Sequence, residues 1–518
     1  MNSISKEKSD TALKTKEYFT SLLEQHDKYN FEVKMNYRLK KDEKINKYLL
    51  SIYFFIPSAL HINQNSYPKE RFFADKTNYI RFKTPKIAVR SIINKNNKLS
   101  PFFRIIKFLD LFEEGTSLDS IQKDLIYESR LLGAILKSSI RDQADYFINN
   151  YSENKICDDI ILNLNDFIKD IEDLESMFTS ISARLCTEQI GEAIRTAFSF
   201  TYQYVSLQIQ DNFTKILKAL HETNGCLSLF DKIEKIVEKQ REIRKSLNSK
   251  LIRNPQDKNE SYIYWEGLLK KFTQGVLYLP LKDKDETTRW TEIFFSIAAG
   301  FAMFISLLLG LWVANMFTQN STPYILAIVV AYMFKDRIKD NLRNYSRKAM
   351  GFVFPDHTWE IQDSISDQKI GKIRETLKYL DWQTLRPEIY RIRMSSAKHE
   401  LEQEGKPETI IRYSKEVKIR PKNVVRRHQR NIDLHDIMRF NIRNFIQYAD
   451  DTIRYEELYN PETKKIEEVE CVKVYHLNLV LRMQYINEKG NNITTYKKVR
   501  VILTQDGIKS MVEPEFSI

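Results

Sequence analysis

The sequence has few of the residues from which compact chemical sites are built. Only 13 of its 518 residues are glycine, and none falls in the GxxxxGK[ST] or GxGxxG spacing that cradles phosphate. There is no GxSxG elbow and no HExxH helix. The four cysteines lie too far apart in sequence to suggest a zinc site: Cys157, Cys186, Cys226 and Cys471. We therefore predict no cofactor, metal or catalytic residues, and a role other than that of an enzyme.

The N-terminal residues also lack an apolar h-region, so we expect no cleaved signal peptide. What the chain has in excess is positive charge, with 81 Lys and Arg against 69 Asp and Glu, a formal net charge of +12. This excess suits a protein beside anionic lipid head groups, and equally weak contact with nucleic acid.

A long uncharged run is the clearest feature of the sequence. From Ile293 to Phe334 there is no Asp, Glu, Lys, Arg or His, and one straight helix of this length would be about twice as long as the hydrocarbon core is thick. The polar insert Thr318–Pro323 divides the run into a first span, Ile293–Val313, and a second, Tyr324–Phe334. The run predicts a transmembrane helical hairpin. A re-entrant second segment is the alternative, because that segment is short.

Charge sets the predicted orientation of this hairpin. Its turn carries no Lys or Arg, whereas Lys335–Lys348 holds six basic residues, so both termini should be cytoplasmic. Three of these side chains could lengthen the second span by reaching toward lipid head groups: Lys335, Arg337 and Lys339.

Small residues recur every fourth position in the predicted spans. They are Ala298, Ala302, Ser306 and Gly310 in the first span and Ala327 and Ala331 in the second. Such spacing lets two helix backbones approach closely in lipid. We favour packing of the hairpin on itself, and an oligomeric seam is the alternative.

The remaining sequence predicts soluble α and β units. Phe31–Leu39 alternates strictly and Tyr48–Ile56 is apolar, which predicts a β-hairpin. Four apolar stripes of helical period between Thr116 and Asn248 predict an antiparallel bundle. Helices are expected near Ile361–Asp381 and Pro387–Glu404. Strands are expected at Thr409–Ile419, Ile437–Ile446, Tyr475–Tyr485, Thr494–Leu503 and a segment ending at Val512.

Together these elements predict an α+β membrane protein with a cytoplasmic helical bundle and β-rich N- and C-terminal units. The expected segments are an N-terminal unit (1–110), the bundle (111–260), the membrane-proximal part and hairpin (261–350), a helical connector (351–407) and a C-terminal β-rich domain (408–518).

Two polar clusters contain side chains that could bind a ligand or take part in catalysis. The stretch Asp356–Glu360 reads as a capped helix start, with a metal or enzymatic site around His357 as the alternative. The segment Arg412–Arg430 is strongly basic and reads as a strand edge protected by charge. Alternatively, lipid phosphates could be contacted by Arg426, Arg427 and Arg430. Few aromatic residues are available for base stacking, so we do not expect a nucleic-acid partner.

Two stretches resemble uncharacterised bacterial membrane proteins. The first is Ile52–Pro57 followed by YPKERFFADKTNYIRFKTP (Tyr67–Pro85), and the second is AYMFKDRIKD at Ala331–Asp340. The resemblance implies a bacterial inner-membrane protein with a central two-helix hairpin, and it implies no activity.

The leading functional expectation is a membrane-anchored cytoplasmic scaffold or sensor of unknown activity. Its expected partners are the lipid bilayer with its anionic lipids, a cytoplasmic protein, and further copies of the chain. A homo-oligomeric membrane pore and a membrane-associated enzyme are the alternatives.

Overall fold

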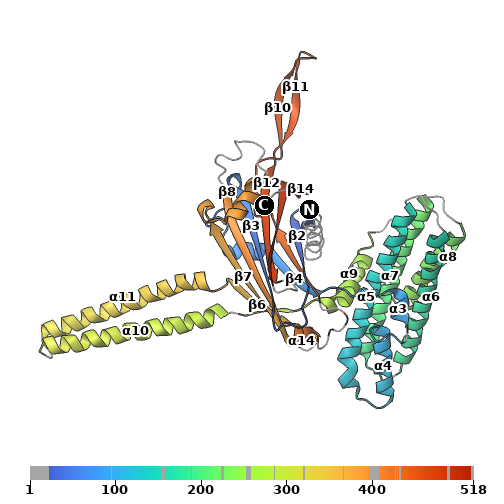
Figure 1. Ribbon diagram of the computed structural model, residues 1–518, viewed down its shortest axis with the longest axis horizontal. Helices are drawn as coiled ribbons and strands as arrows, with labels where there is room; N and C mark the ends of the chain where they lie inside the picture. The colour runs from blue at the N-terminus through green and yellow to red at the C-terminus, as the bar shows by residue number, and fades with distance from the viewer. Residues whose placement is uncertain are drawn as a thin grey trace, which may run out of the picture.

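The computed structural model shows a central β domain with a helical bundle on one side and a long helical hairpin projecting from the other (Figure 1). It describes residues 23–514 except 95, 153–157, 188, 223–226, 252–257, 285, 319–320, 366, 396–407, 426–427, 429, 431–432 and 487–490. The protein is thus of mixed α and β structure with β-sheets, as predicted. We refer to the β domain and the bundle together as the head.

An antiparallel eight-stranded sheet forms the larger layer of the β domain, in the order β14-β13-β12-β3-β8-β7-β6-β5. Its central strand β3 comes from the N-terminal part of the chain and lies between β8 and β12 from the C-terminal part. The β-rich ends of the sequence therefore fold into one domain. The bounds are β3 Asn46–Pro57, β5 Leu281–Asp283, β6 His357–Gln362, β7 Lys369–Leu380, β8 Glu408–Ile419, β12 Tyr475–Ile486, β13 Asn492–Thr504 and β14 Gly507–Val512.

A four-stranded antiparallel sheet, β1-β2-β9-β4, packs on one face of the larger sheet. Its strands are β1 Leu23–Gln25, β2 Asn30–Tyr37, β4 Lys76–Phe82 and β9 Leu434–Asn441. The rings of Phe54 from the larger sheet and Phe440 from the smaller one lie 5.4 Å apart, and Phe72 from helix α2 (Lys69–Asp75) contacts both. Helix α12 (Pro387–Met394) covers the opposite face of the larger sheet through Ile389 and Ile392.

Two expectations for the β domain are wrong. Strands β2 and β3 exist, but they belong to different sheets and do not form a hairpin. Residues 361–381 are not helical, because they form the end of β6 and the whole of β7. The apolar residues Ile370, Ile373 and Leu377 have the spacing of one helix face. The inward positions of β7 also include Gly371 and Glu375, which hid the period of two.

The bundle contains the four predicted helices, and further helices pack on them. The four are α5 Leu118–Ser152, α6 Asp158–Leu185, α7 Glu192–Glu222 and α8 Leu227–Ser246; the others are α3 Val89–Ile93, α4 Pro101–Glu113 and α9 Glu260–Gln274. Ring stacking of Phe178 on Tyr202, with centroids 4.5 Å apart, joins α6 to α7. The hydrophobic core is continuous from the bundle into the β domain.

Two elements project from the head (Figure 1). Helices α10 (Glu286–Met316) and α11 (Thr322–Val353) form the α-hairpin. Strands β10 (Ile453–Asn460) and β11 (Lys465–Val472) pair only with each other among the described strands. Short 3₁₀ turns complete the described elements: η1 Ser58–Leu60, η2 Gly275–Leu277, η3 Trp382–Thr384, with the single helical turn α14 Pro421–Val425.

Candidate membrane hairpin and its junction with the head

The outer surface of the α-hairpin is apolar along α10. Residues Trp290–Met316 are long and apolar enough to cross a membrane, and only 11% of their most apolar window is buried. Large side chains such as Phe301, Leu307 and Leu311 are more than half exposed. Folded proteins rarely leave so many large apolar side chains in water, so this surface marks a contact with lipid or with another protein.

Three of the six small residues of the hairpin are buried between its two helices. Ala298, Ala302 and Ala331 are buried there, whereas the other members of the set are partly exposed: Ser306, Gly310 and Ala327. A methyl group added at Gly310 would meet no atom within 4 Å. The close approach of the helices thus depends on the three alanines, which agrees with packing of the hairpin on itself.

The two helices differ in the length of their apolar surface. On α11, Lys335 follows the turn by about 20 Å of helix, at roughly the level of Met303 in the middle of the apolar run of α10. Lys335 lies over the ring of Tyr332, while Arg337 is exposed and Lys339 partly exposed. Between Met303 and the head, α10 is therefore apolar as far as Ile293, whereas the neighbouring part of α11, from Lys335 on, is charged.

Both legs of the α-hairpin continue directly into the edge of the large sheet. Strand β5, before α10, pairs with β6, after α11, at Leu281↔Ile361 and Asp283↔Trp359. Glu360 on β6 accepts hydrogen bonds from the Nζ atoms of Lys284 and Lys369. These two ammonium groups lower the pKa of Glu360 to about 2, so the pair of legs is held by charge as well as by the strand ladder.

This arrangement accounts for the Asp356–Glu360 cluster. Its residues begin a strand and not a helix, which corrects the capped-helix interpretation. Asp356 accepts hydrogen bonds from Lys69 and from the backbone N–H of Leu377, and His357 packs against the ring of Phe73. Within the described part of the chain no group of three or more His, Cys, Asp or Glu side chains is arranged to hold a metal ion.

Buried ion pairs fix the bundle to the β domain. Arg430 is paired with Glu128 of α5, with Nη2 and Oε2 2.8 Å apart, and its side chain is only 6% exposed. Glu128 is also paired with Arg104 of α4. Nearby, His428 lies 3.1 Å from both Asp363 and Tyr127. Arg430 therefore joins parts of the head instead of facing lipid; Arg426 and Arg427 lie outside the described residues.

A second buried network lies between the two sheets. The carboxylate of Glu375 on β7 accepts hydrogen bonds from Lys76, Asn78, Trp359 and Tyr413. Burial alone would raise the pKa of Glu375, but Lys76, Lys415 and the donated hydrogen bonds lower it to about 2.

Two residues of the smaller sheet extend this network. Lys415 on β8 donates to Asp436 on β9 at 2.7 Å, and Tyr37 on β2 donates to the same carboxylate. All the charged groups are satisfied within the core, so the network holds the sheets in one register.

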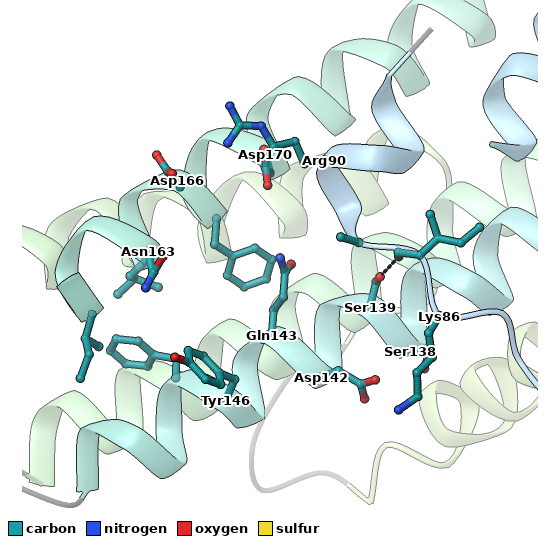
Figure 2. Close-up of a pocket in the computed structure, with 16 residues that line it drawn as sticks. Lys86, Arg90, Ser138, Ser139, Asp142, Gln143, Tyr146, Asn163, Asp166 and Asp170 are labelled. Carbon is teal, nitrogen blue, oxygen red and sulfur yellow. Dashed lines mark hydrogen bonds between the residues drawn. The ribbon is translucent and has the colours of Figure 1, made fainter. Parts of the chain in front are cut away.

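Two of the hollows on the surface of the head are lined by α5. The larger of these two, of about 630 Å³, lies between α5, α6 and residues 86–90. Figure 2 shows Asp166 and Asp170 on α6, with Asp170 beside Arg90, and Gln143 and Tyr146 on α5. The hydroxyl of Ser139 donates to the backbone oxygen of Ile87, so it is not presented as a nucleophile.

The smaller hollow, of about 250 Å³, is strongly basic, and we call it the basic hollow. It lies where β4, β9, α5 and the end of α9 meet. Its polar lining residues are Arg81, Lys83, Thr84, Lys86, Lys137, Ser138, Arg141, Gln274 and His435. Sequence reasoning missed this cluster, because its members come from four elements separated by up to 354 positions and share no local pattern.

Comparisons of the chain with protein-family models, with curated proteins and with solved structures returned no match.

Proposed function

We propose that the protein is a membrane-anchored cytoplasmic scaffold or sensor, in which the α-hairpin holds a rigid two-part head at the inner face of the membrane. The observation that carries the proposal is the uncovered apolar surface of α10. Burial of such side chains in hydrocarbon is favourable by roughly 25 cal/mol per Å². The basic residues that follow the α11 apolar segment favour a cytoplasmic head.

The build of the head supports a sensing role. Sheet and bundle are joined by a continuous core and by the Arg430–Glu128 ion pair, so they should move as one unit. Strand pairing joins the head to the α-hairpin at the β5–β6 edge. A displacement of that edge would therefore be transmitted to both hairpin legs together.

The anchor is tested by placing a charge on the exposed face of α10. Leu307→Arg should move the protein out of the carbonate-resistant membrane fraction, because an arginine at the centre of a lipid-facing helix costs roughly 2.5–3.5 kcal/mol. Ile263→Arg, at a similarly exposed apolar position on α9 in the head, is the matched control and should leave fractionation unchanged.

The opposite outcome is equally informative. If Leu307→Arg stays membrane-bound, or if the unmodified protein is released by carbonate, then α10 does not contact lipid and the proposal is wrong. The homo-oligomeric pore remains an alternative prediction, because it needs several copies of the chain to line a path.

A further inference from the structure

The basic hollow concentrates positive charge that its own walls do not neutralise. Five of the lining residues are Lys or Arg and none is Asp or Glu. Arg141 is paired with Asp142, at 2.6 Å, and more distantly with Asp145, at 4.0 Å. The Nε of Arg81 is buried and has no hydrogen-bond partner among the described residues. A buried donor left without an acceptor is unfavourable, so an anion in the hollow would satisfy it.

The environment of the hollow lowers the pKa values of two of its side chains, Lys137 and His435. Burial lowers the pKa of Lys137 to about 8, helped by Lys270, Arg141 and Arg81 and opposed by Glu266. Burial and the charges of Arg81, Lys83 and Lys34 lower the pKa of His435 to about 4. Both groups resist protonation chiefly because they are buried, and the neighbouring positive charges add to this effect.

We propose that the basic hollow binds a small, multiply charged anion of the phosphate class. Arg81 offers a planar donor fork that matches phosphate oxygens, and Lys86 and Lys137 offer mobile point charges. Arg141, whose Nε and Nη2 donate to Asp142, adds a further guanidinium group to the wall. Thr84 and Ser138 add hydroxyl donors at the rim. A volume of about 250 Å³ is far more than one water needs and has room for a phosphate or diphosphate group.

The position of the hollow connects it with the α-hairpin. Gln274 and Leu277 form part of its wall, and the chain continues from there through β5 into α10. On the way, the N–H of Leu279 donates to the backbone oxygen of Ile80, next to Arg81. An anion held between α5, β4 and α9 would therefore fix the strand that leads to the membrane. This coupling rests on the proposed function, whereas the binding itself does not.

The test is calorimetric titration of the full-length protein in a neutral detergent with inorganic pyrophosphate and with sulfate at pH 7. We expect saturable binding that weakens about tenfold or more in Lys137→Gln, because one charge-assisted contact is lost. Lys123→Gln removes one charge from an exposed site on the same helix, outside the hollow, and should bind within about twofold of the parent protein.

Folding does not confound this comparison. Removal of Lys137 relieves repulsion, so Lys137→Gln should unfold at the same or a higher temperature than the parent. Sulfate stays doubly charged in this range, so its affinity should fall as pH rises through about 8, where Lys137 loses its proton. Equal affinities of Lys137→Gln and Lys123→Gln, or a pH-independent sulfate affinity, would overturn the proposal.

A lipid head group could supply the same phosphate chemistry. Vesicles of phosphatidylcholine with and without phosphatidic acid distinguish this source, because Lys137-dependent retention on phosphatidic acid without pyrophosphate binding assigns the hollow to lipid. If the protein binds neither pyrophosphate nor phosphatidic acid, the proposal is wrong. If carbonate releases the protein from the membrane but pyrophosphate still binds in a Lys137-dependent way, the proposed membrane anchor is wrong and the proposed anion site stands.

Discussion

Removing the charge of Glu375 should cost a large part of the stability of the β domain. The carboxylate is fully buried, and its pKa of about 2 compares with 4.5 for an unperturbed glutamate. At about 1.4 kcal/mol per pKa unit, the native environment stabilises the ionised form by about 3 kcal/mol. A similar figure, roughly 3–5 kcal/mol, is typical when one partner of a buried ion pair is removed. We expect Glu375→Gln to lose this amount, because Lys76 then lacks its counter-charge, whereas Lys415 keeps Asp436.

The pKa of Glu375 also predicts the direction in which stability changes with pH. Since the folded pKa lies below the unfolded one, the contribution of Glu375 is complete above about pH 4.5 and is lost as pH falls toward 2. The parent protein should lose stability over this window, and Glu375→Gln should lose less. The assay is guanidinium unfolding in detergent, followed by tryptophan fluorescence, because Trp359 donates a hydrogen bond to Glu375 at 3.1 Å.

Two outcomes would refute this reasoning. A loss below about 1 kcal/mol at pH 7 would mean that the carboxylate is not the counter-charge of Lys76. An unchanged acid slope in Glu375→Gln would assign the acid sensitivity to other carboxylates. Lys34→Gln is the control, because its pair with the exposed Glu24 should contribute less than about 1 kcal/mol and Glu32 keeps its pair with Arg439.

Three further predictions concern the head. Arg430→Met should lower stability by about 2–3 kcal/mol in thermal unfolding by leaving Glu128 with only Arg104, whereas the exposed control Arg184→Met should cost less than about 1 kcal/mol. Gly371→Ala should lower the unfolding temperature, because the added Cβ would lie 2.5 Å from the backbone oxygen of Lys418, at a cost of about 1–3 kcal/mol. Lys137→Gln should raise the free energy of unfolding by up to about 1 kcal/mol, after allowance for solvent screening. Calorimetry at several pH values should show this gain shrinking above pH 8, because Lys137 of the parent protein is then neutral in the folded state. A destabilised Lys137→Gln, a neutral Gly371→Ala or a neutral Arg430→Met would contradict the corresponding argument.

The sequence predicts elements well where one pattern governs a whole segment. Strict alternation marked β2 and the β12–β13 hairpin, and long apolar stripes marked α5 to α8. It fails where a polar residue occupies a core position. Glu375 lies in the core because Lys76 reaches it from the other sheet, and no local rule reveals that partner. The residual apolar spacing of β7 then imitated a helix.

The sequence also does not reveal which distant segments lie side by side in the fold. The eight residues 38–45 between β2 and β3 look like a hairpin turn, yet they carry the chain from one sheet to the other. Arg430 looked like a surface cation because its counter-charge, Glu128, is 302 positions away. The basic hollow is hidden for the same reason. Its charge is invisible as a run in the sequence and becomes apparent only when four elements converge.

The unequal apolar lengths of α10 and α11 predict how deeply the hairpin enters the membrane. A hairpin that crossed the ~30 Å core would place Asp336 and Asp340 in hydrocarbon, because they follow the turn by only about 21 and 27 Å. A charged residue at the centre of the core costs roughly 2.5–3.5 kcal/mol, and the cost falls toward the interface. An oblique hairpin, with α10 toward the lipid and the charged half of α11 at the head groups, avoids this cost.

We therefore expect the turn to stay within the membrane, as in the re-entrant alternative. In a variant whose four native cysteines are replaced by serine, Ser321→Cys should resist a membrane-impermeant maleimide added from outside intact spheroplasts and react after detergent is added. Tyr345→Cys, exposed near the base of α11, should react only when the cytoplasmic face is opened. Labelling of Ser321→Cys from outside would show that both helices cross, and that the acidic residues of α11 are neutralised within the membrane.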